Sequence, residues 1–154
     1  MDFTRQTLPA QPYLYVEREC PYDGPKIAEA MGSAIGEIGA FVAEKGIAAL
    51  GPPMSIYLGM DPSILRFRTA VPVAAVDAAK AGGAVKADTL PAGDAIATTH
   101  VGTYANLNQT HRALWDHMAA EGLSGAFPIW EIYLDDPREV PEEQLRTEIR
   151  RAIA

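Results

Sequence analysis

The segment Pro128-Ile129-Trp130-Glu131-Ile132-Tyr133-Leu134 places one carboxylate in the middle of an apolar, aromatic stretch. Stretches rich in branched and aromatic residues are typical of β-strands. A buried, ionised carboxylate is costly unless it is paired or hydrogen-bonded. Glu131 therefore needs either a partner within the fold or a cationic or hydrogen-bonding ligand from outside.

The same strand has an earlier counterpart in the chain, Pro52-Pro53-Met54-Ser55-Ile56-Tyr57-Leu58, in which Ser55 stands where Glu131 does. Similar parts surround both strands: a helix before, an Asp-Pro step after, and then a further strand. Ordered repetition of this kind indicates duplicated structural units. We expect one α+β domain over residues 1–154, built from two strand-helix-strand-strand repeats at about 10–76 and 85–154, with Tyr57 equivalent to Tyr133 across a pseudo-twofold.

Periodicity predicts the individual elements. Tyr13 to Glu19 alternates as a strand, with Leu14 and Val16 on one face and Tyr13, Tyr15 and Glu17 on the other. Apolar residues at helical spacing predict helices over Ile27–Val42 and about Tyr104–Glu121. We expect Gly32, Gly36 and Gly39 to let a neighbouring element approach the first helix closely. Ala74 to Gly93 is expected to connect the repeats.

Side-chain alternation separates the residues around Glu131 into two sets. Ile129, Glu131 and Tyr133 share one face, and Trp130, Ile132 and Leu134 share the other, which we expect to form the core under the helices. With Tyr57 and Tyr15, the first set would form an aromatic groove with one negative charge, suited to a flat, lipophilic cation. The alternative is structural: Glu131 turned to solvent or paired with Arg68 or Arg150.

Composition excludes several classes of function. Thirteen basic against twenty acidic residues give a net charge of −7, which repels a nucleic-acid backbone. One cysteine, Cys20, permits no internal disulfide or cysteine-based metal cluster, and the three histidines lack metal-ligand spacing. No phosphate loop or dinucleotide motif is present, so we expect no cofactor. Without a long apolar run or signal segment, we expect a cytoplasmic protein that does not enter the membrane.

Four phrases of the chain resemble one known family. They are Leu90-Pro91-Ala92-Gly93, His100-Val101-Gly102-Thr103-Tyr104, Pro128 to Leu134, and Thr147-Glu148-Ile149-Arg150. They look like the GyrI-like small-molecule-binding domain, which is related to effector-binding domains of AraC-type and multidrug-responsive regulators. The resemblance covers the second repeat well and the first weakly. It implies an antiparallel sheet with helices on one side, a ligand groove between the repeats, and Glu131 as the acidic residue of that groove.

Three functions follow from these observations as expectations. The first is a stand-alone protein that binds lipophilic, cationic aromatic compounds. The ligand-binding candidates are Glu131, Tyr133, Trp130, Tyr57, Tyr15, Phe67, His100 and Tyr104, although a strand histidine beside a glycine, as His100 is, usually has a structural role. The second, implied by the resemblance, is a hydrolase that opens cyclopropane rings of DNA-alkylating natural products, with Glu131 as general acid or base. The third is a gyrase-inhibitor-like interaction protein, although no pattern indicates a protein partner.

We predict that this chain does not bind DNA sequence-specifically, because its net charge of −7 opposes phosphate contacts and no DNA-reading helix is apparent on either side of the expected domain. An electrophoretic mobility shift at low salt should show no saturable complex. A saturable complex that depends on DNA sequence would contradict the prediction.

Overall fold

The two strands that carry the repeated Ile-Tyr motif pair with each other at the centre of one eight-stranded antiparallel sheet. In the computed structural model, which describes residues 1–154, β3 (Met54–Tyr57) runs beside β7 (Gly125–Tyr133) with Ser55 opposite Glu131. The sheet order, β1-β6-β8-β7-β3-β4-β2-β5, is symmetric about this pair. The halves β2-α1-β3-β4 and β6-α3-β7-β8 are the expected strand-helix-strand-strand repeats.

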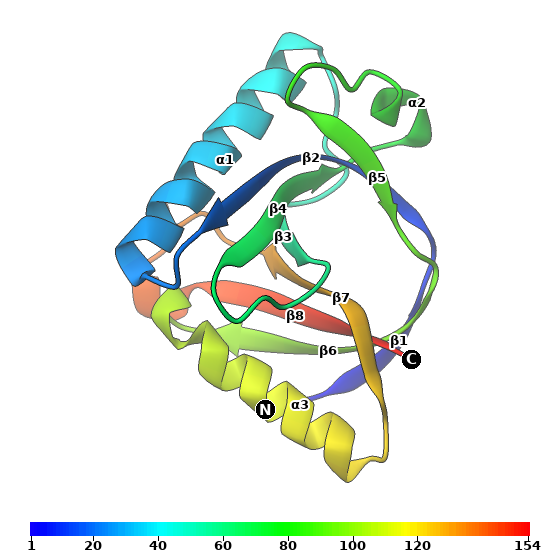
Figure 1. Ribbon diagram of the computed structural model, residues 1–154, viewed down its shortest axis with the longest axis vertical. Coiled ribbons are helices and arrows are strands. Elements are labelled where there is room, and N and C mark those ends of the chain that lie inside the picture. The colour runs from blue at the N-terminus through cyan, green and yellow to red at the C-terminus, as the bar shows by residue number, and fades with distance from the viewer.

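The remaining elements complete the two halves and connect them (Figure 1). The strands are β1 (Thr4–Leu8), β2 (Gln11–Cys20), β4 (Leu65–Pro72), β5 (Lys86–Leu90), β6 (Gly93–Val101) and β8 (Arg146–Ile153). The helices are α1 (Gly24–Glu44), α2 (Ala75–Ala78) and α3 (Leu107–Ala120), with short 3-10 helices η1 (Tyr104–Asn106) and η2 (Glu142–Gln144).

The register of the central pair confirms a pseudo-twofold relation between the halves. Met54 lies opposite Ile132, and Ile56 lies opposite Trp130. A twofold axis through the Ser55–Glu131 pair exchanges these two contacts and relates Tyr57 to Tyr133. The axis therefore passes through the one position at which the two strands differ most in chemistry, a serine facing a glutamate.

Each half lends its first strand to the other half. β1 precedes β2 in the chain but pairs with β6, and β5 precedes β6 but pairs with β2. The same four-residue motif occurs at the end of both strands, as Thr7-Leu8-Pro9-Ala10 and as Thr89-Leu90-Pro91-Ala92. β1 was not predicted from the sequence, and β5 falls within Ala74 to Gly93, which was expected to connect the repeats. The alternation of polar and apolar residues in each short strand was too weak to predict them. The repeated Thr-Leu-Pro-Ala motif, however, could have been recognised in the sequence.

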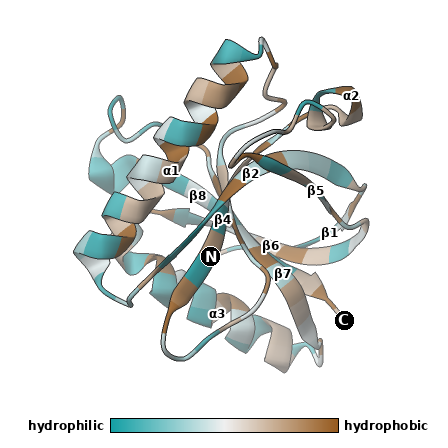
Figure 2. Ribbon diagram, turned by 45° about the horizontal axis from the view of Figure 1, so that its top comes forward, coloured by the Kyte–Doolittle hydropathy of each residue, from teal (hydrophilic) through white to brown (hydrophobic).

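Both long helices pack on the same face of the sheet, each over its own half. Around α1 the core contains Ala34 and Ile38, with Leu14 and Val16 of β2. Around α3 it contains Leu114 and Met118, with Ile96 and Ile149 from the second half. Hydrophobic and hydrophilic residues alternate along both helices, as expected for elements with one buried side (Figure 2). The two clusters share no residue. The midline of this face, over the central strands β3 and β7, therefore belongs to neither helix core.

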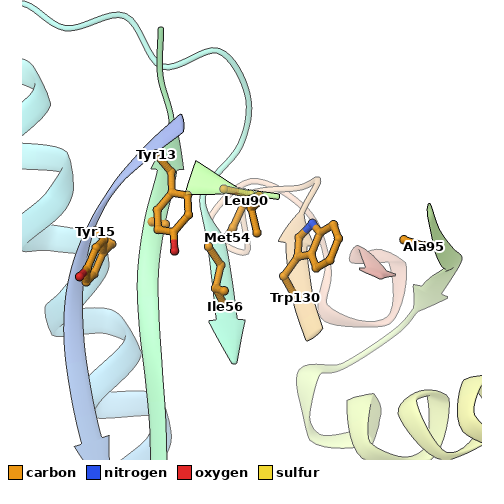
Figure 3. Close-up of a cluster of buried hydrophobic side chains, with 8 residues drawn as sticks. Tyr13, Tyr15, Met54, Ile56, Leu90, Ala95 and Trp130 are labelled. Carbon is orange, nitrogen blue, oxygen red and sulfur yellow. The ribbon is translucent and has the colours of Figure 1, made fainter. Parts of the chain in front are cut away.

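The opposite face carries a single aromatic cluster that spans both halves (Figure 3). Trp130 packs there with Tyr13, Tyr15, Met54 and Ile56, and no helix residue belongs to the cluster. Leu8 and Leu90, from the two edge strands, pack against the same cluster, so the sheet curls towards this face. The expectation that Trp130 lies under the helices is therefore wrong, because alternation defines two faces without saying which one the helices cover.

The glycines of α1 do not serve close packing. A Cβ atom added at Gly32, Gly36 or Gly39 would meet nothing within 4 Å. All three are exposed, so the expectation of a close neighbour is wrong. Gly46, in contrast, follows the end of the helix with a φ of 65°, which residues with a side chain rarely adopt. No helix in the structure is long and apolar enough to cross a bilayer.

The burial pattern of α1 gives a stability prediction with an internal control. Ile38 is 1% exposed and Ile35 is 40% exposed on the same helix. We expect Ile38→Ala to lower the free energy of unfolding by about 2–5 kcal/mol, because it leaves a cavity beneath the helix. Ile35→Ala should cost less than about 1 kcal/mol. Urea denaturation followed by circular dichroism measures both, and equal losses would contradict the packing described.

Candidate functional site

Glu131 lies on the helix-covered face at the midline between α1 and α3, and its side chain is almost fully enclosed. The residue is 4% exposed. One carboxylate oxygen, Oε2, lies 2.6 Å from Nε2 of His111 on α3. The other, Oε1, accepts hydrogen bonds from the hydroxyls of Tyr133 at 2.8 Å and Tyr57 at 3.3 Å. With Ser55, whose Oγ lies 2.7 Å from the Tyr133 hydroxyl oxygen, these residues form the Glu131 cluster.

Three elements bring the cluster together. Strand alternation places Tyr133 two residues after Glu131, so both project from the same face of β7. The antiparallel register places Ser55 directly opposite Glu131, and Tyr57 follows on the same face of β3. The third element is α3, whose buried stripe includes Leu114 and Met118 and carries His111 over the midline. The cluster therefore joins both halves and one helix.

The two tyrosines of the cluster remain hydrogen-bond donors. Burial and the negative charge of Glu131 raise the pKa of the Tyr133 and Tyr57 hydroxyls well above the usual value of 10.0. Both hydroxyls therefore keep their protons over the whole physiological range. Hydrogen bonds to a charged acceptor are stronger than neutral ones, so the two tyrosines stabilise the ionised carboxylate without neutralising it.

No arginine or lysine compensates Glu131. Arg68 binds Asp88 at 2.7 Å and stacks over the ring of Tyr15 on the opposite face, and Arg150 binds Glu148 at 2.6 Å. The structural alternative with Arg68 or Arg150 as partner is therefore wrong. The ion-pair partner within the protein is His111, and this contact is an ion pair only while the imidazole carries a second proton.

Aromatic and unpaired polar groups surround the cluster. The Tyr104 ring from η1 lies 5.5 Å from the Tyr133 ring, centroid to centroid. The sulfur of Met31 on α1 lies 4.0 Å from the Tyr133 hydroxyl. In neighbouring strands, Thr69 lies opposite Ser55 and Thr147 lies opposite Tyr133, and both have buried hydroxyls without a hydrogen-bond partner. Residues that lie opposite each other in neighbouring antiparallel strands project from the same face, so both hydroxyls lie on the helix-covered face with Glu131.

The candidates from the sequence do not all meet at this site. Tyr57 and Tyr133 bind the Glu131 carboxylate, and Tyr104 packs against Tyr133. Tyr15 and Trp130 lie on the other face, so the expectation that Tyr15 faces Glu131 is wrong: the residue shares its side of β2 with Tyr13, not with the residues that contact α1.

Two further candidates are buried apart from the carboxylate. Phe67, 1% exposed, lies two residues from Thr69 on the same face of β4. His100 is held at both ring nitrogens, with Nε2 2.9 Å from the Thr103 carbonyl oxygen and Nδ1 2.6 Å from the Thr110 hydroxyl. Because a carbonyl oxygen only accepts, Nε2 carries the proton. The ring therefore joins the end of β6 to the start of α3.

Sequence reasoning missed His111, the partner of Glu131. His111 was considered only as a possible metal ligand, and no group of three or more potential ligand residues occurs in the structure. One signal was available. His111 falls at helical spacing with the core positions Leu107, Leu114 and Met118. A histidine on a buried helix stripe, in a chain with an unpaired strand carboxylate, is a candidate partner for it.

Two surface hollows lie elsewhere. One of about 320 Å³ lies against β1, β6 and β8, and one of about 340 Å³ lies beside the turn after β3, next to Leu58 and Met60. Neither includes Glu131. Both arginines of the second hollow already have carboxylate partners: Arg66 binds Glu19, and Arg68 contacts Glu17 and Asp88. Chemistry therefore favours the Glu131 cluster, which side chains close over in this structure.

Comparison with solved structures shows the same fold in proteins of low sequence identity. The C-terminal domain of EcmrR matches with a TM-score of 0.85 at 17% identity, covering 99% of this chain and 97% of that domain. SAV2435 bound to tetraphenylphosphonium matches with a TM-score of 0.69 at 14% identity, covering 100% of this chain and 94% of the other. A hydrolase from Listeria innocua matches with a TM-score of 0.67 at 19% identity, covering 99% and 91%.

A search of curated proteins finds no significant match. A family model, in contrast, matches nearly the whole chain, over residues 1–153. Its description is the GyrI-like small-molecule-binding domain, the family that the sequence phrases indicated. The chain belongs to the GyrI-like small-molecule-binding domain family.

Proposed function

We propose that this protein binds lipophilic cations between α1 and α3, with Glu131 as the counter-charge. One observation carries the proposal: a carboxylate that is 4% exposed has no arginine or lysine partner. A buried charge pair needs both members, and removal of one leaves a costly orphan. A cationic ligand would supply the positive charge that a neutral His111 does not.

The surroundings of Glu131 fit an aromatic, lipophilic cation better than a small hydrated one. Tyr104 and Tyr133 offer ring surfaces, and Met31 offers a flexible, polarisable side chain. Aromatic rings attract cations through their negative faces, and methionine adapts to varied ligand shapes. The fold similarity to SAV2435, which was solved with tetraphenylphosphonium, motivates the choice of probe and does not itself assign a ligand to this chain.

A second candidate function rests on the contact between His111 and Glu131. An imidazole 2.6 Å from a carboxylate is an arrangement that can take a proton from water. In a hydrolase of the cyclopropane-opening kind, water would bond to a ring carbon as a ring C–C bond breaks. The displaced electron pair would move into a conjugated carbonyl group, which takes up a proton. The fold is shared with a hydrolase from Listeria innocua, at 19% identity.

We predict that Glu131→Gln weakens the binding of methyltriphenylphosphonium by about 2–5 kcal/mol, the range for loss of one member of a buried charge pair. Triphenylphosphine oxide, a neutral compound of similar shape, should lose much less affinity. Titration calorimetry of both compounds with both proteins measures the difference. Thermal melting shows whether the variant remains folded.

Glu17→Gln is the matched control, since Glu17 is exposed on the other face of the sheet and should leave both affinities unchanged. An equal loss for the cation and the neutral compound would contradict the counter-charge role of Glu131. So would a large fall in melting temperature with unchanged charge preference, which would assign Glu131 to the stability of the fold.

Incubation of the wild-type protein with a cyclopropane-containing alkylator, followed by chromatography for the ring-opened product, tests the hydrolase alternative.

A further inference from the structure

His111 occupies the place at Glu131 that a ligand cation would take. Its Nε2 lies 2.6 Å from the carboxylate, and its side chain is 18% exposed at the edge of the site. The other bonds to Glu131 come from tyrosine hydroxyls, which can remain when a cation arrives. A cation at Glu131 and a protonated imidazole at Glu131 therefore compete for one charge.

We propose that His111 is a built-in competitor that sets the charge selectivity of the site, so that a cationic ligand binds by displacing the His111 side chain and releasing its proton. This inference rests on the proposed function, because it describes how the same site discriminates among ligands. Neutral compounds need not displace the imidazole and do not release the proton. The protein would therefore accept permanent cations more readily in alkaline than in acidic solution.

Few other groups near His111 can gain or lose a proton between acidic and alkaline solution. Glu131 and Tyr133 face it from β7, Tyr57 lies on β3, and Tyr104 lies on η1; α1 contributes Met31, which does not titrate. The charges that act on these tyrosines from further away are Cys20 on β2, Asp135 bound to Arg146, and Asp136 bound to Arg138. The pKa values of Tyr57, Tyr133, Tyr104 and Cys20 are raised, and those of Asp135 and Asp136 are lowered. The test must therefore distinguish protonation of His111 from protonation of Glu131.

The direction of the pH effect follows from linkage. Nε2 of His111 lies 2.6 Å from the carboxylate in the free protein, and a cation that takes its place breaks this contact. If the displaced imidazole was charged, its proton competes with the cation, so we expect binding to release protons and the affinity for the cation to rise with pH. The slope is limited to about tenfold in affinity per pH unit, since one proton at most is released from His111.

The test is calorimetric titration of tetraphenylphosphonium between about pH 5.5 and 8.5 in buffers with different heats of ionisation, which count the protons released. Wild-type protein should show rising affinity and proton release. His111→Gln keeps a neutral hydrogen-bond donor and removes the competing charge. It should bind about tenfold tighter than wild type at the acid end, with less than about twofold change across the range.

His117→Gln is the control, because it makes the same change on the same helix, where the ring stacks on Phe3 away from Glu131. It should keep the wild-type profile. Thermal melting checks that each variant is folded, and His111→Asn replaces His111→Gln if the latter is not. Triphenylphosphine oxide should bind wild type without proton release.

Three results would overturn the inference. An equal slope in wild type and His111→Gln would assign the titration to Glu131 itself. If wild-type protein binds tetraphenylphosphonium with the same affinity at every pH, His111 does not compete with the cation, and the proposed function remains intact. Absence of cation binding in both proteins at every pH would overturn the proposed function and this inference with it.

Discussion

The pairing of β3 with β7 is the contact on which this structure depends. It joins the two halves into one sheet, sets the pseudo-twofold axis and brings Ser55 against Glu131. An axis places equivalent side chains next to each other, so two carboxylates here would repel and could not both be ionised. The duplicated fold thus allows one acidic residue at its centre, and the asymmetry of Ser55 and Glu131 meets that constraint.

Polar groups lie along the midline of the helix-covered face, where the apolar clusters of the two long helices do not meet. Each long helix has its own apolar cluster, whereas the other face has one cluster that continues across the axis. The stability of the domain can therefore come from the continuous face and from the two helix cores. The midline between the helix cores holds a charge, three tyrosines and unpaired hydroxyls. The free energy that these polar groups cost is offset by the apolar contacts elsewhere in the fold.

How much could be predicted from the sequence differs between the fold and the site. Repeated order of motifs predicted the two units and the equivalence of Tyr57 with Tyr133, because duplication leaves the same pattern twice. Which strand face meets the helices was not readable, since both faces of β7 are apolar or aromatic apart from Glu131; hence Tyr15 and Trp130 were placed wrongly. His111 was missed because its contact with Glu131 depends on how α3 packs, which helical spacing alone does not specify.

The exchange of edge strands means that neither half is a complete folding unit. Without β1 the second half would lose a neighbour of β6, and without β5 the first would lose a neighbour of β2. Contacts of this kind join residues far apart in the chain, which slows folding and makes it all-or-none rather than stepwise. An ancestral half-length chain with this arrangement would have had to assemble as a pair, each copy completing the sheet of the other.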